Sequence, residues 1–375
     1  MTALKCFLLD HGYTSQNSAP CCHMLFTKVF TGPLPTSFTN MHTNRHYIEI
    51  KQSMDRGVWH KACNDCQIVE ERNVPNVQSK RQLVLDHYNN TKCDGLIDLT
   101  LAPGYLCNLQ CRSCNPWLSS SWVAEYQTPA MAVIDHQNWI KDYAQAKFSP
   151  APVYNYDDDD WSTVKYVNFV GGEPLYNPEF YKQLEKIAND TNGDCVISIT
   201  TNATVVLDIN KYHLLSKFKE IHIGLSIDSV GRSAEFIRTG TVWSKVAKNI
   251  EFYKSVKMFS NTTEYHLTNS VLNLLETHAT VTWLESRGIP RCGLVTHVTG
   301  PAHLTYSVLT DAEKQEIVKR LAGTRAEYII PVLDEYPFDP VNRTNFLRFM
   351  EHTKNYHGMD WKDYLPDLYN IMNEA

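Results

Sequence analysis

Three cysteines lie close together in the chain, at Cys107, Cys111 and Cys114, in the spacing C-x-x-x-C-x-x-C. Thiolates are ligands of iron-sulfur clusters and of zinc. Three thiolates on one short loop can hold three irons of a [4Fe-4S] cube and leave the fourth iron open to another ligand. A zinc site completed by a fourth residue is the alternative, and the spacing favours iron and sulfur.

A pair of glycines forms a second motif that could take part in ligand binding. Gly171 and Gly172 follow an apolar run at 164–170 and precede Glu173 and Pro174. Two glycines allow a tight turn and a close approach of the backbone to a ligand, and the glutamate can accept a hydrogen bond from an ammonium group. Gly-Gly-Glu-Pro alone is a common turn, but it becomes specific when it ends the strand that follows the three-cysteine loop.

A further group of cysteines is spread over the first part of the chain. It comprises Cys6, the adjacent Cys21 and Cys22, and Cys63 and Cys66 in a C-x-x-C spacing. The sequence around the first of them is rich in turn-forming residues, so we expect a loop-rich region that is short of core. We expect these cysteines to hold that region together in place of a large core.

Short apolar runs alternate with helical patterns from residue 95 onward, and these elements must position the motifs. Strands are predicted at 96–101, 164–170, 196–200, 220–227, 265–272 and 293–298. Helices are predicted at 46–57, 117–126, 178–188, 209–217, 242–256, 276–287, 311–322 and 342–356, with another at 135–146 inside an insertion at about 129–160. The alternation predicts a parallel sheet with crossover helices, as an open six-stranded barrel or a doubly wound sheet, with ligands at the carboxyl ends of the strands.

The composition indicates a globular chain without a strong net charge. Its 375 residues include 35 Lys and Arg against 41 Asp and Glu, which gives a net charge of -6 and no electrostatic basis for nucleic-acid binding. The 11 cysteines are an odd number, which argues against a full disulfide framework. No apolar run approaches the ~20 residues that cross a bilayer, and no signal peptide is evident, so we expect a cytoplasmic protein that binds neither membranes nor nucleic acids.

The pairing of Cys-Asn-Leu-Gln-Cys-Arg-Ser-Cys at 107–114 with Gly-Gly-Glu-Pro at 171–174 resembles the radical S-adenosylmethionine (SAM) enzymes, over residues of about 95 to 300. The resemblance implies an α/β fold, a partial (β/α)6 TIM-like barrel. It also implies that Cys107, Cys111 and Cys114 hold a [4Fe-4S] cluster, whose open iron binds the amino and carboxylate groups of SAM.

The same resemblance implies direct contacts between the protein and SAM. Gly171, Gly172 and Glu173 would hold the methionyl ammonium. The contacts to the ribose and the carboxylate would come from polar residues near strand ends, which are Asn202, Ser226, Asp228, Arg238 and Asn273. The resemblance assigns no side chain a catalytic role.

The N-terminal cysteines resemble those of a twitch-type auxiliary cluster domain. In that resemblance Cys6, Cys21, Cys63 and Cys66 close a second, auxiliary [4Fe-4S] site, with Cys22 as the alternative to Cys21. A four-cysteine zinc ribbon would staple the same weak core and is the competing interpretation. The predicted domains are an auxiliary cluster domain at 1–92, a barrel at 93–325 and a helical tail packed on the barrel at 326–375.

The resemblance implies reductive cleavage of SAM to a 5'-deoxyadenosyl radical that abstracts hydrogen from a substrate. An external one-electron reductant of the flavodoxin or ferredoxin type would supply the electron. Oxidation or cross-linking of a peptide or protein side chain is the leading interpretation of the reaction. One alternative is a dehydrogenase, mutase or methyltransferase acting on a small molecule, and another is a noncatalytic binding protein stapled by iron-sulfur or zinc.

Overall fold

The computed structural model describes most of the chain and divides into two compact units. The described residues are 4–14, 19–21, 36–72, 79–88, 95–116, 118–134, 159–256, 259 and 262–374. The first unit comprises Met1–Gly104, Ser149–Ile199 and Asp208–Ile221. The second unit comprises Tyr105–Phe148, Thr200–Leu207 and His222–Ala375.

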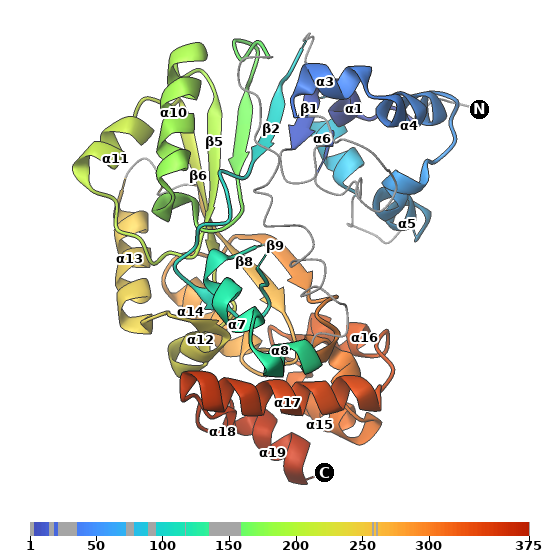
Figure 1. Cartoon of the computed structure of the whole chain (residues 1–375), viewed down its shortest axis with the longest axis vertical. Helices are drawn as coiled ribbons and strands as arrows, with labels where there is room; N and C mark the ends of the chain where they lie inside the picture. Colours follow the sequence, from blue (N-terminus) through green and yellow to red (C-terminus); the bar gives the residue numbers. More distant parts are fainter. Residues whose placement is uncertain are drawn as a thin grey trace. The chain divides into compact units, whose positions relative to one another are not determined.

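Parallel strands alternate with helices along the chain (Figure 1). The strands of the main sheet are β1 (Gly12–Thr14), β2 (Asp98–Leu101), β4 (Tyr166–Phe169), β5 (Val196–Thr201), β6 (Glu220–Ser226), β8 (Thr263–Asn269) and β9 (Cys292–His297). Their order is β1-β2-β4-β5-β6-β8-β9, and the pairs β1-β2, β2-β4, β4-β5, β6-β8 and β8-β9 are parallel. This mixed α/β architecture is the predicted partial TIM-like barrel, and all six predicted strands are present with somewhat different ends.

In the first unit, side chains alternate between buried and partly exposed along β2, β4 and β5. Helix α10 (Pro178–Asp190) packs on this sheet, because the ring of its Phe180 meets the ring of Phe169 edge-on at 4.7 Å. The helix begins with the Asn177 side chain as N-cap and a proline in its first turn, which is a favourable start. Helix α11 (Ile209–Leu215) is capped in the same way by Asp208.

The N-terminal part of the first unit contains loops and short helices. These are α1 (Phe7–His11), α3 (Phe38–Thr43), α4 (Arg45–Asp55), η1 (Lys61–Cys63), α5 (Asn64–Arg72) and α6 (Lys80–Tyr88). Strand β1 was not predicted, and it joins this region to β2 of the sheet. Leu8, Val84, Tyr88 and Ile97 form one apolar cluster of this region, with Cys6, Phe7 and Cys21 packed against it. Met41, Tyr47, Ile50 and Met54 are buried as well, so the region has more core than the sequence pattern suggested.

The second unit carries most of the helices. They are η2 (Ser120–Trp122), α7 (Val123–Tyr126), α8 (Pro129–Ile134), α12 (Gly231–Ile237), α13 (Trp243–Ser255), α14 (Thr277–Ser286), η4 (Ala302–Leu304), η5 (Tyr306–Val308), α15 (Asp311–Leu321), η6 (Glu327–Ile329), α16 (Ile330–Leu333), α17 (Pro340–His357), α18 (Trp361–Tyr364) and α19 (Pro366–Glu374). A two-stranded antiparallel ribbon, β3 (Gln110–Cys111) with β7 (Arg238–Thr239), also lies in this unit.

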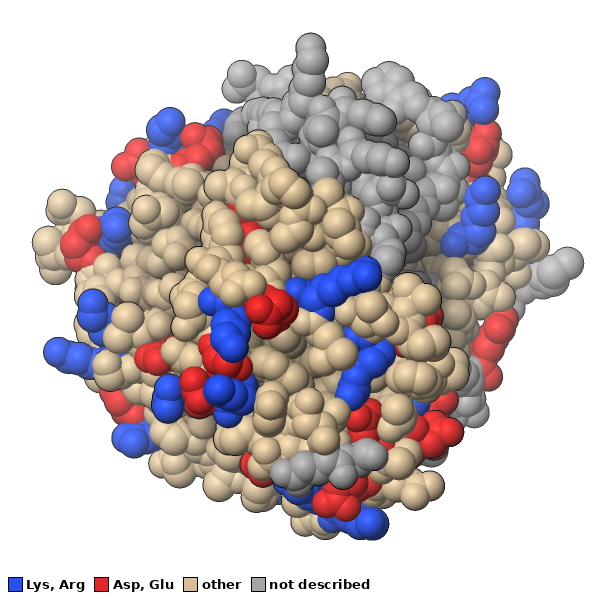
Figure 2. Space-filling model, turned by 60° about the horizontal axis from the view of Figure 1, so that its bottom comes forward, with Lys and Arg blue, Asp and Glu red and all other residues tan. Residues whose placement is uncertain are grey.

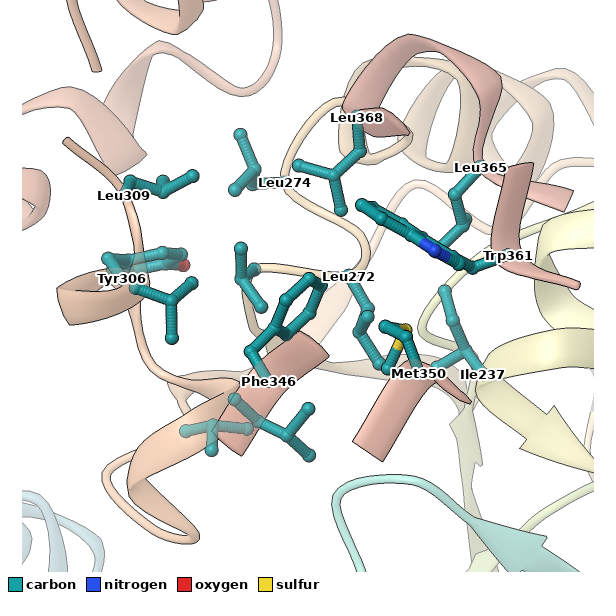
Figure 3. Packing of buried hydrophobic residues seen from close by; sticks show 14 of the residues in the cluster. Ile237, Leu272, Leu274, Tyr306, Leu309, Phe346, Met350, Trp361, Leu365 and Leu368 are labelled. Atoms are coloured by element: carbon teal, nitrogen blue, oxygen red, sulfur yellow. The ribbon is translucent and has the colours of Figure 1, made fainter. Parts of the chain in front are cut away.

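A large apolar core holds the second unit together (Figure 3). Helix α17 contributes Phe346 and Met350, and Trp361 of α18 packs edge-on against Phe346 at 5.3 Å. These side chains meet Leu272 and Ile237 from segments much earlier in the chain (Figure 3). The C-terminal helices therefore share one core with the strand-end loops of this unit.

Some predicted elements differ from the observed ones. The helix predicted at 117–126 is a 3-10 turn followed by the short α7, and the strand predicted at 265–272 ends at Asn269 because a buried turn follows it. The helix predicted at 135–146 lies outside the described residues.

None of the helices in the described part of the chain has the length and apolar character needed to cross a bilayer. On the face that Figure 2 presents, acidic and basic side chains are interspersed.

Candidate active site

The loop with Cys107, Cys111 and Cys114 belongs to the second unit and is held by its neighbours in the chain. The Ser119 hydroxyl donates to the Leu109 carbonyl at 2.7 Å, and the Trp122 indole donates to the Cys111 carbonyl at 2.9 Å. Cys111 also lies in β3, where it pairs with Arg238 of β7. The backbone of the loop is therefore held at several points.

The three thiols of this loop lie together. Cys107 and Cys111 are buried in one cluster, Cys114 packs against it, and the Cys111 and Cys114 side chains are hydrogen-bonded. That hydrogen bond, supported by the nearby guanidinium of Arg238, lowers the pKa of Cys111 although burial opposes it. The loop therefore offers three neighbouring sulfurs as possible ligands. This donor set fits an iron-sulfur cluster.

Asn202, which directly follows β5, reaches the cysteine loop. Its Nδ2 lies 4.0 Å from the Cys107 sulfur and donates to Oδ1 of Asn108 at 3.0 Å. Its Oδ1 accepts from the backbone N–H and the hydroxyl of Thr204, at 3.0 and 2.6 Å. The Asn202 amide is therefore oriented by the turn that follows the strand, with its N–H group toward sulfur.

Arg238 and Asp228 form an ion pair beside the same loop. Their side chains approach to 2.8 Å, and Nη1 of Arg238 lies 3.7 Å from the Cys111 sulfur. Burial by itself would lower the pKa of Arg238, but the carboxylate of Asp228 and the two nearby cysteines raise it above its usual value. Asp228 also accepts from the Thr268 N–H at 2.9 Å. Both predicted residues thus border the cysteines.

Ser226 and Asn273 have different surroundings. Ser226 is the last residue of β6 and is partly buried. Asn273 lies beyond the end of β8 and is fully buried, and its Nδ2 donates to the carbonyls of Asp228 and Thr268 at 2.9 and 3.0 Å. Its observed contacts support the backbone that carries Asp228, and a contact of Asn273 with SAM stays a prediction.

Gly171, Gly172 and Glu173 follow β4 in the first unit. Both glycines have positive φ angles, 83° and 55°, and a Cβ at Gly171 would come within 3.0 Å of the Ala102 Cβ. Glycine is therefore required at Gly171 by conformation and by space. Glu173 is 1% exposed, and its carboxylate accepts from the Leu175 N–H at 3.1 Å at the start of η3 (Pro174–Tyr176).

The four N-terminal cysteines line one cavity in the first unit. Cys6, Cys21, Cys63 and Cys66 border it together with apolar residues and Arg81. Burial, with repulsion from neighbouring cysteines, raises the pKa of Cys63 to about 12 and that of Cys6 to about 11. The repulsion involves Cys6, Cys63 and Cys66. Cys22, the alternative ligand, lies outside the described residues.

The two cysteine groups are not arranged around a single metal ion. No three His, Cys, Asp or Glu side chains among the described residues converge on one ion position. Ligands of an iron-sulfur cube bind different irons and stand further apart than ligands of one ion.

The structure also places side chains near the loop that the sequence patterns did not indicate. Glu125 of α7 is fully buried and accepts from Gln110 of β3 at 2.5 Å, and from His352 and His357 of α17 at 2.9 and 2.8 Å. Arg112 lies in the interior beside Cys111. No local pattern marks such residues, because the histidines are more than two hundred positions from Glu125 in the chain.

The chain was compared with families of known proteins. The family model described as the radical SAM superfamily matches residues 101–271. This segment belongs to the radical SAM superfamily. It includes Cys107, Cys111 and Cys114, the Gly-Gly-Glu-Pro turn, and Asn202, Ser226, Asp228 and Arg238. Asn273 and the N-terminal cysteines lie outside the matched radical SAM segment.

Two solved structures with some similarity to the chain contain bound S-adenosylmethionine by their titles. Native anSMEcpe with bound AdoMet is 18% identical, with 70% of this chain and 62% of that chain covered and a TM-score of 0.37. SuiB of Streptococcus suis bound to S-adenosylmethionine is 16% identical, with 83% and 65% covered and a TM-score of 0.35. The chain thus spans less than two thirds of the length of either protein. No curated protein matches the sequence.

Proposed function

We propose that the chain is a radical SAM enzyme that cleaves SAM reductively and uses the resulting radical to abstract hydrogen from a substrate. The observation that carries the proposal is the cysteine loop: three neighbouring thiols within the segment that matches the radical SAM superfamily. The enzyme is an oxidoreductase or a transferase, according to the fate of the substrate radical.

Cys107, Cys111 and Cys114 would hold a [4Fe-4S] cluster. When bound and reduced by one electron from an external flavodoxin or ferredoxin type of protein, this cluster would supply the chemistry that splits SAM into methionine and a 5'-deoxyadenosyl radical. The chain itself has to bind and orient SAM and to exclude water and oxygen.

The residues around the cysteine loop suit the binding of SAM. The guanidinium of Arg238 would attract the SAM carboxylate, and Asp228 holds that guanidinium in place at 2.8 Å. Asn202 and Ser226 would contact the ribose or the carboxylate. Gly171, Gly172 and Glu173 would hold the ammonium, and in this role the Glu173 carboxylate and the strand-end carbonyls act as hydrogen-bond acceptors.

An auxiliary [4Fe-4S] cluster on Cys6, Cys21, Cys63 and Cys66 belongs to the proposal. The support is that these four cysteines line one cavity, although up to sixty residues separate them in the sequence. With four thiolates its coordination is complete, so it would transfer electrons and stabilise the N-terminal region rather than ligate a substrate. A zinc ribbon on the same four cysteines is the alternative.

The leading substrate is a peptide or protein side chain, which the enzyme would oxidise or cross-link. A small-molecule dehydrogenase, mutase or methyltransferase would use the same SAM site with a different pocket. The deciding measurement is deuterium transfer: a deuterated substrate passes its label to 5'-deoxyadenosine. Label from deuterated candidate peptides supports the peptide assignment, whereas label from a deuterated alcohol or sugar alone would favour the alternative.

The proposed function is tested by anaerobic reconstitution with iron and sulfide, followed by dithionite and SAM. Wild type should hold roughly eight irons and form 5'-deoxyadenosine, and the variant C107A/C111A/C114A should hold roughly four and form none. Cys292→Ala, which changes an exposed cysteine, is the matched control and should behave as wild type. Bound zinc in place of iron, or iron without SAM cleavage, would contradict the enzyme assignment and indicate a noncatalytic binding protein stabilised by a metal.

A further inference from the structure

Arg112 is a charged residue in the interior of the second unit, directly after Cys111. It is 1% exposed, and its backbone N–H donates to the Ile237 carbonyl at 2.8 Å. Its Nε, Nη1 and Nη2 atoms are buried and have no hydrogen-bond partner among the described residues. A cation buried in this way loses its hydration without a replacement, which is unfavourable.

Three aromatic rings surround the Arg112 guanidinium. Its Cζ lies 5.9 Å from the ring of Trp122, 5.6 Å from that of Phe236 and 5.9 Å from that of Phe349. The faces of the rings attract a cation and recover part of the lost hydration. Because rings carry no net charge, they do not cancel the positive charge, and its field extends to neighbouring groups.

Arg112 interacts electrostatically with two groups that can carry negative charge, the carboxylate of Glu125 and the sulfur of Cys111. Burial lowers the pKa of Arg112 to about 10, whereas Glu125 and Cys111 act in the opposite direction. The carboxylate of Glu125 already accepts hydrogen bonds from one glutamine and two histidines.

The second guanidinium beside Cys111 differs in this respect. Arg238 is paired with Asp228 at 2.8 Å, so a hydrogen-bonded carboxylate offsets part of its charge at the cysteine. Arg112 makes no hydrogen bond to a carboxylate among the described residues, and Glu125 acts on it only through its field. Of these two arginines, Arg112 therefore supplies the less compensated positive charge.

We infer that Arg112 raises the reduction potential of the cluster that Cys111 helps to hold, and so eases its reduction before SAM is cleaved. The inference rests on the proposed function. The step is the transfer of one electron from an external reductant to the oxidised cluster, which gains one negative charge while no bond is made or broken. A fixed positive charge in a low-dielectric interior stabilises the more negative state. Arg112 is thus a positioning residue that acts on the cluster through its field.

The experiment is a potentiometric titration of the reconstituted full chain, read by the electron paramagnetic resonance signal of the reduced cluster that changes on addition of SAM. For Arg112→Met, the ratio of reduced to oxidised cluster at a fixed potential should fall about tenfold, which is a midpoint about 59 mV more negative. Arg112→Lys keeps the charge and should stay close to wild type. Arg232→Met is the matched control, because Arg232 also lies over a ring, that of Tyr364 at 4.9 Å, but is exposed.

Each outcome separates the inference from the proposed function. A Met variant that holds wild-type iron and cleaves SAM, but titrates at the wild-type potential, overturns the inference and leaves the function intact. A shift of equal size in Arg112→Lys also overturns it, because altered packing would then be the cause. If Arg112→Met does not take up iron, Arg112→Gln provides the neutral variant. Absence of iron or SAM cleavage in wild type would instead contradict the proposed function.

Discussion

The two cysteine groups of this protein are supported by different means. The three-cysteine loop is held by the Ser119 hydroxyl and the Trp122 indole, and Trp122 belongs to the large apolar core of the second unit. The four N-terminal cysteines line a cavity beside a small apolar cluster, and Cys6 and Cys21 themselves pack against that cluster. The first loop is therefore anchored by hydrogen bonds to a large core, whereas the N-terminal cysteines line a cavity in a region of loops and short helices.

The charges near the two groups differ as well. Arg112 and Arg238 lie beside Cys111, and Asn202 directs an amide toward Cys107. At the N-terminal cavity, Arg81 is engaged by Glu70 in an ion pair in which both side chains are 14% exposed. In the proposed function, the three-cysteine loop would combine an incomplete ligand set with nearby polar groups, as a reactive site requires, and the four-cysteine cavity would be a closed structural site.

The largest expected effect comes from removing two of the proposed ligands at the N-terminal cavity. In C63S/C66S we expect roughly four fewer irons per chain and at least a tenfold faster tryptic cleavage at basic residues such as Arg56 and Lys61, because metal binding supplies folding energy there. SAM cleavage should persist. Iron analysis and mass spectrometry of timed digests provide the measurement.

Cys292→Ser is the control for C63S/C66S and should change neither iron content nor digestion. Unchanged iron in the double variant would mean that the two cysteines are not ligands, and the contrast between the two groups would be lost.

The next effect concerns Glu125, which stabilises the second unit without metal. Burial would raise its pKa, but hydrogen bonds from His352 and His357 outweigh burial and lower it to about 2. A carboxyl group with a lowered pKa stabilises the fold above its unfolded value of about 4.5, and this stability is lost as pH falls toward 2. We expect Glu125→Gln to lower the free energy of unfolding by about 3 kcal/mol at pH 7.

Urea unfolding of the apoprotein between pH 7 and 3 measures the contribution of Glu125. The pH dependence below 4.5 should flatten in Glu125→Gln and stay unchanged in the control Glu185→Gln, whose side chain is exposed on α10. Equal stability of Glu125→Gln and wild type would show that this network does not support the second unit.

A smaller effect is expected at Gly171, in the part of the first unit that does not depend on cysteines. An alanine there would adopt a positive φ and also approach the Ala102 Cβ to 3.0 Å. Gly231→Ala is the matched control, since Gly231 has φ +65° with open space around it. We expect both variants to lose about 1 kcal/mol from the backbone and Gly171→Ala to lose about 1 kcal/mol more from crowding, as measured by urea unfolding. Identical losses would show that the turn relaxes at no cost.

The smallest effect tests the support of the three-cysteine loop. Ser119→Ala leaves the Leu109 carbonyl without its hydroxyl donor, so we expect a loss of about 1 kcal/mol in the free energy of unfolding. The matched control is Ser255→Ala, which removes an exposed hydroxyl that donates to the Phe252 carbonyl at 2.8 Å and should change little. Equal values for the two variants would show that Ser119 adds no support beyond that of a surface serine.

The ligands and the turn that define the superfamily are local in the sequence. Cys107, Cys111 and Cys114 fall within eight residues, so covalent geometry keeps their sulfurs near one another in any compact loop. The strands were predictable for the same reason, because the apolar residues that each strand buries recur within one short segment of the sequence. Even so, the strand expected at 265–272 was too long at its end, because apolar residues of the following turn are buried too.

The environment of the cysteine loop was decided only by the tertiary structure. Glu125 meets His352 and His357 across more than two hundred residues, and Phe349 reaches Arg112 from the same C-terminal helix. Contacts of this kind depend on which elements pack together. Forming each contact costs chain entropy, because distant segments are brought together, and burial in the surrounding core must offset that cost. A single residue such as Arg112 has no periodicity to reveal it, and only the folded structure shows that its guanidinium lies among aromatic rings without a hydrogen-bond acceptor in the described part of the chain.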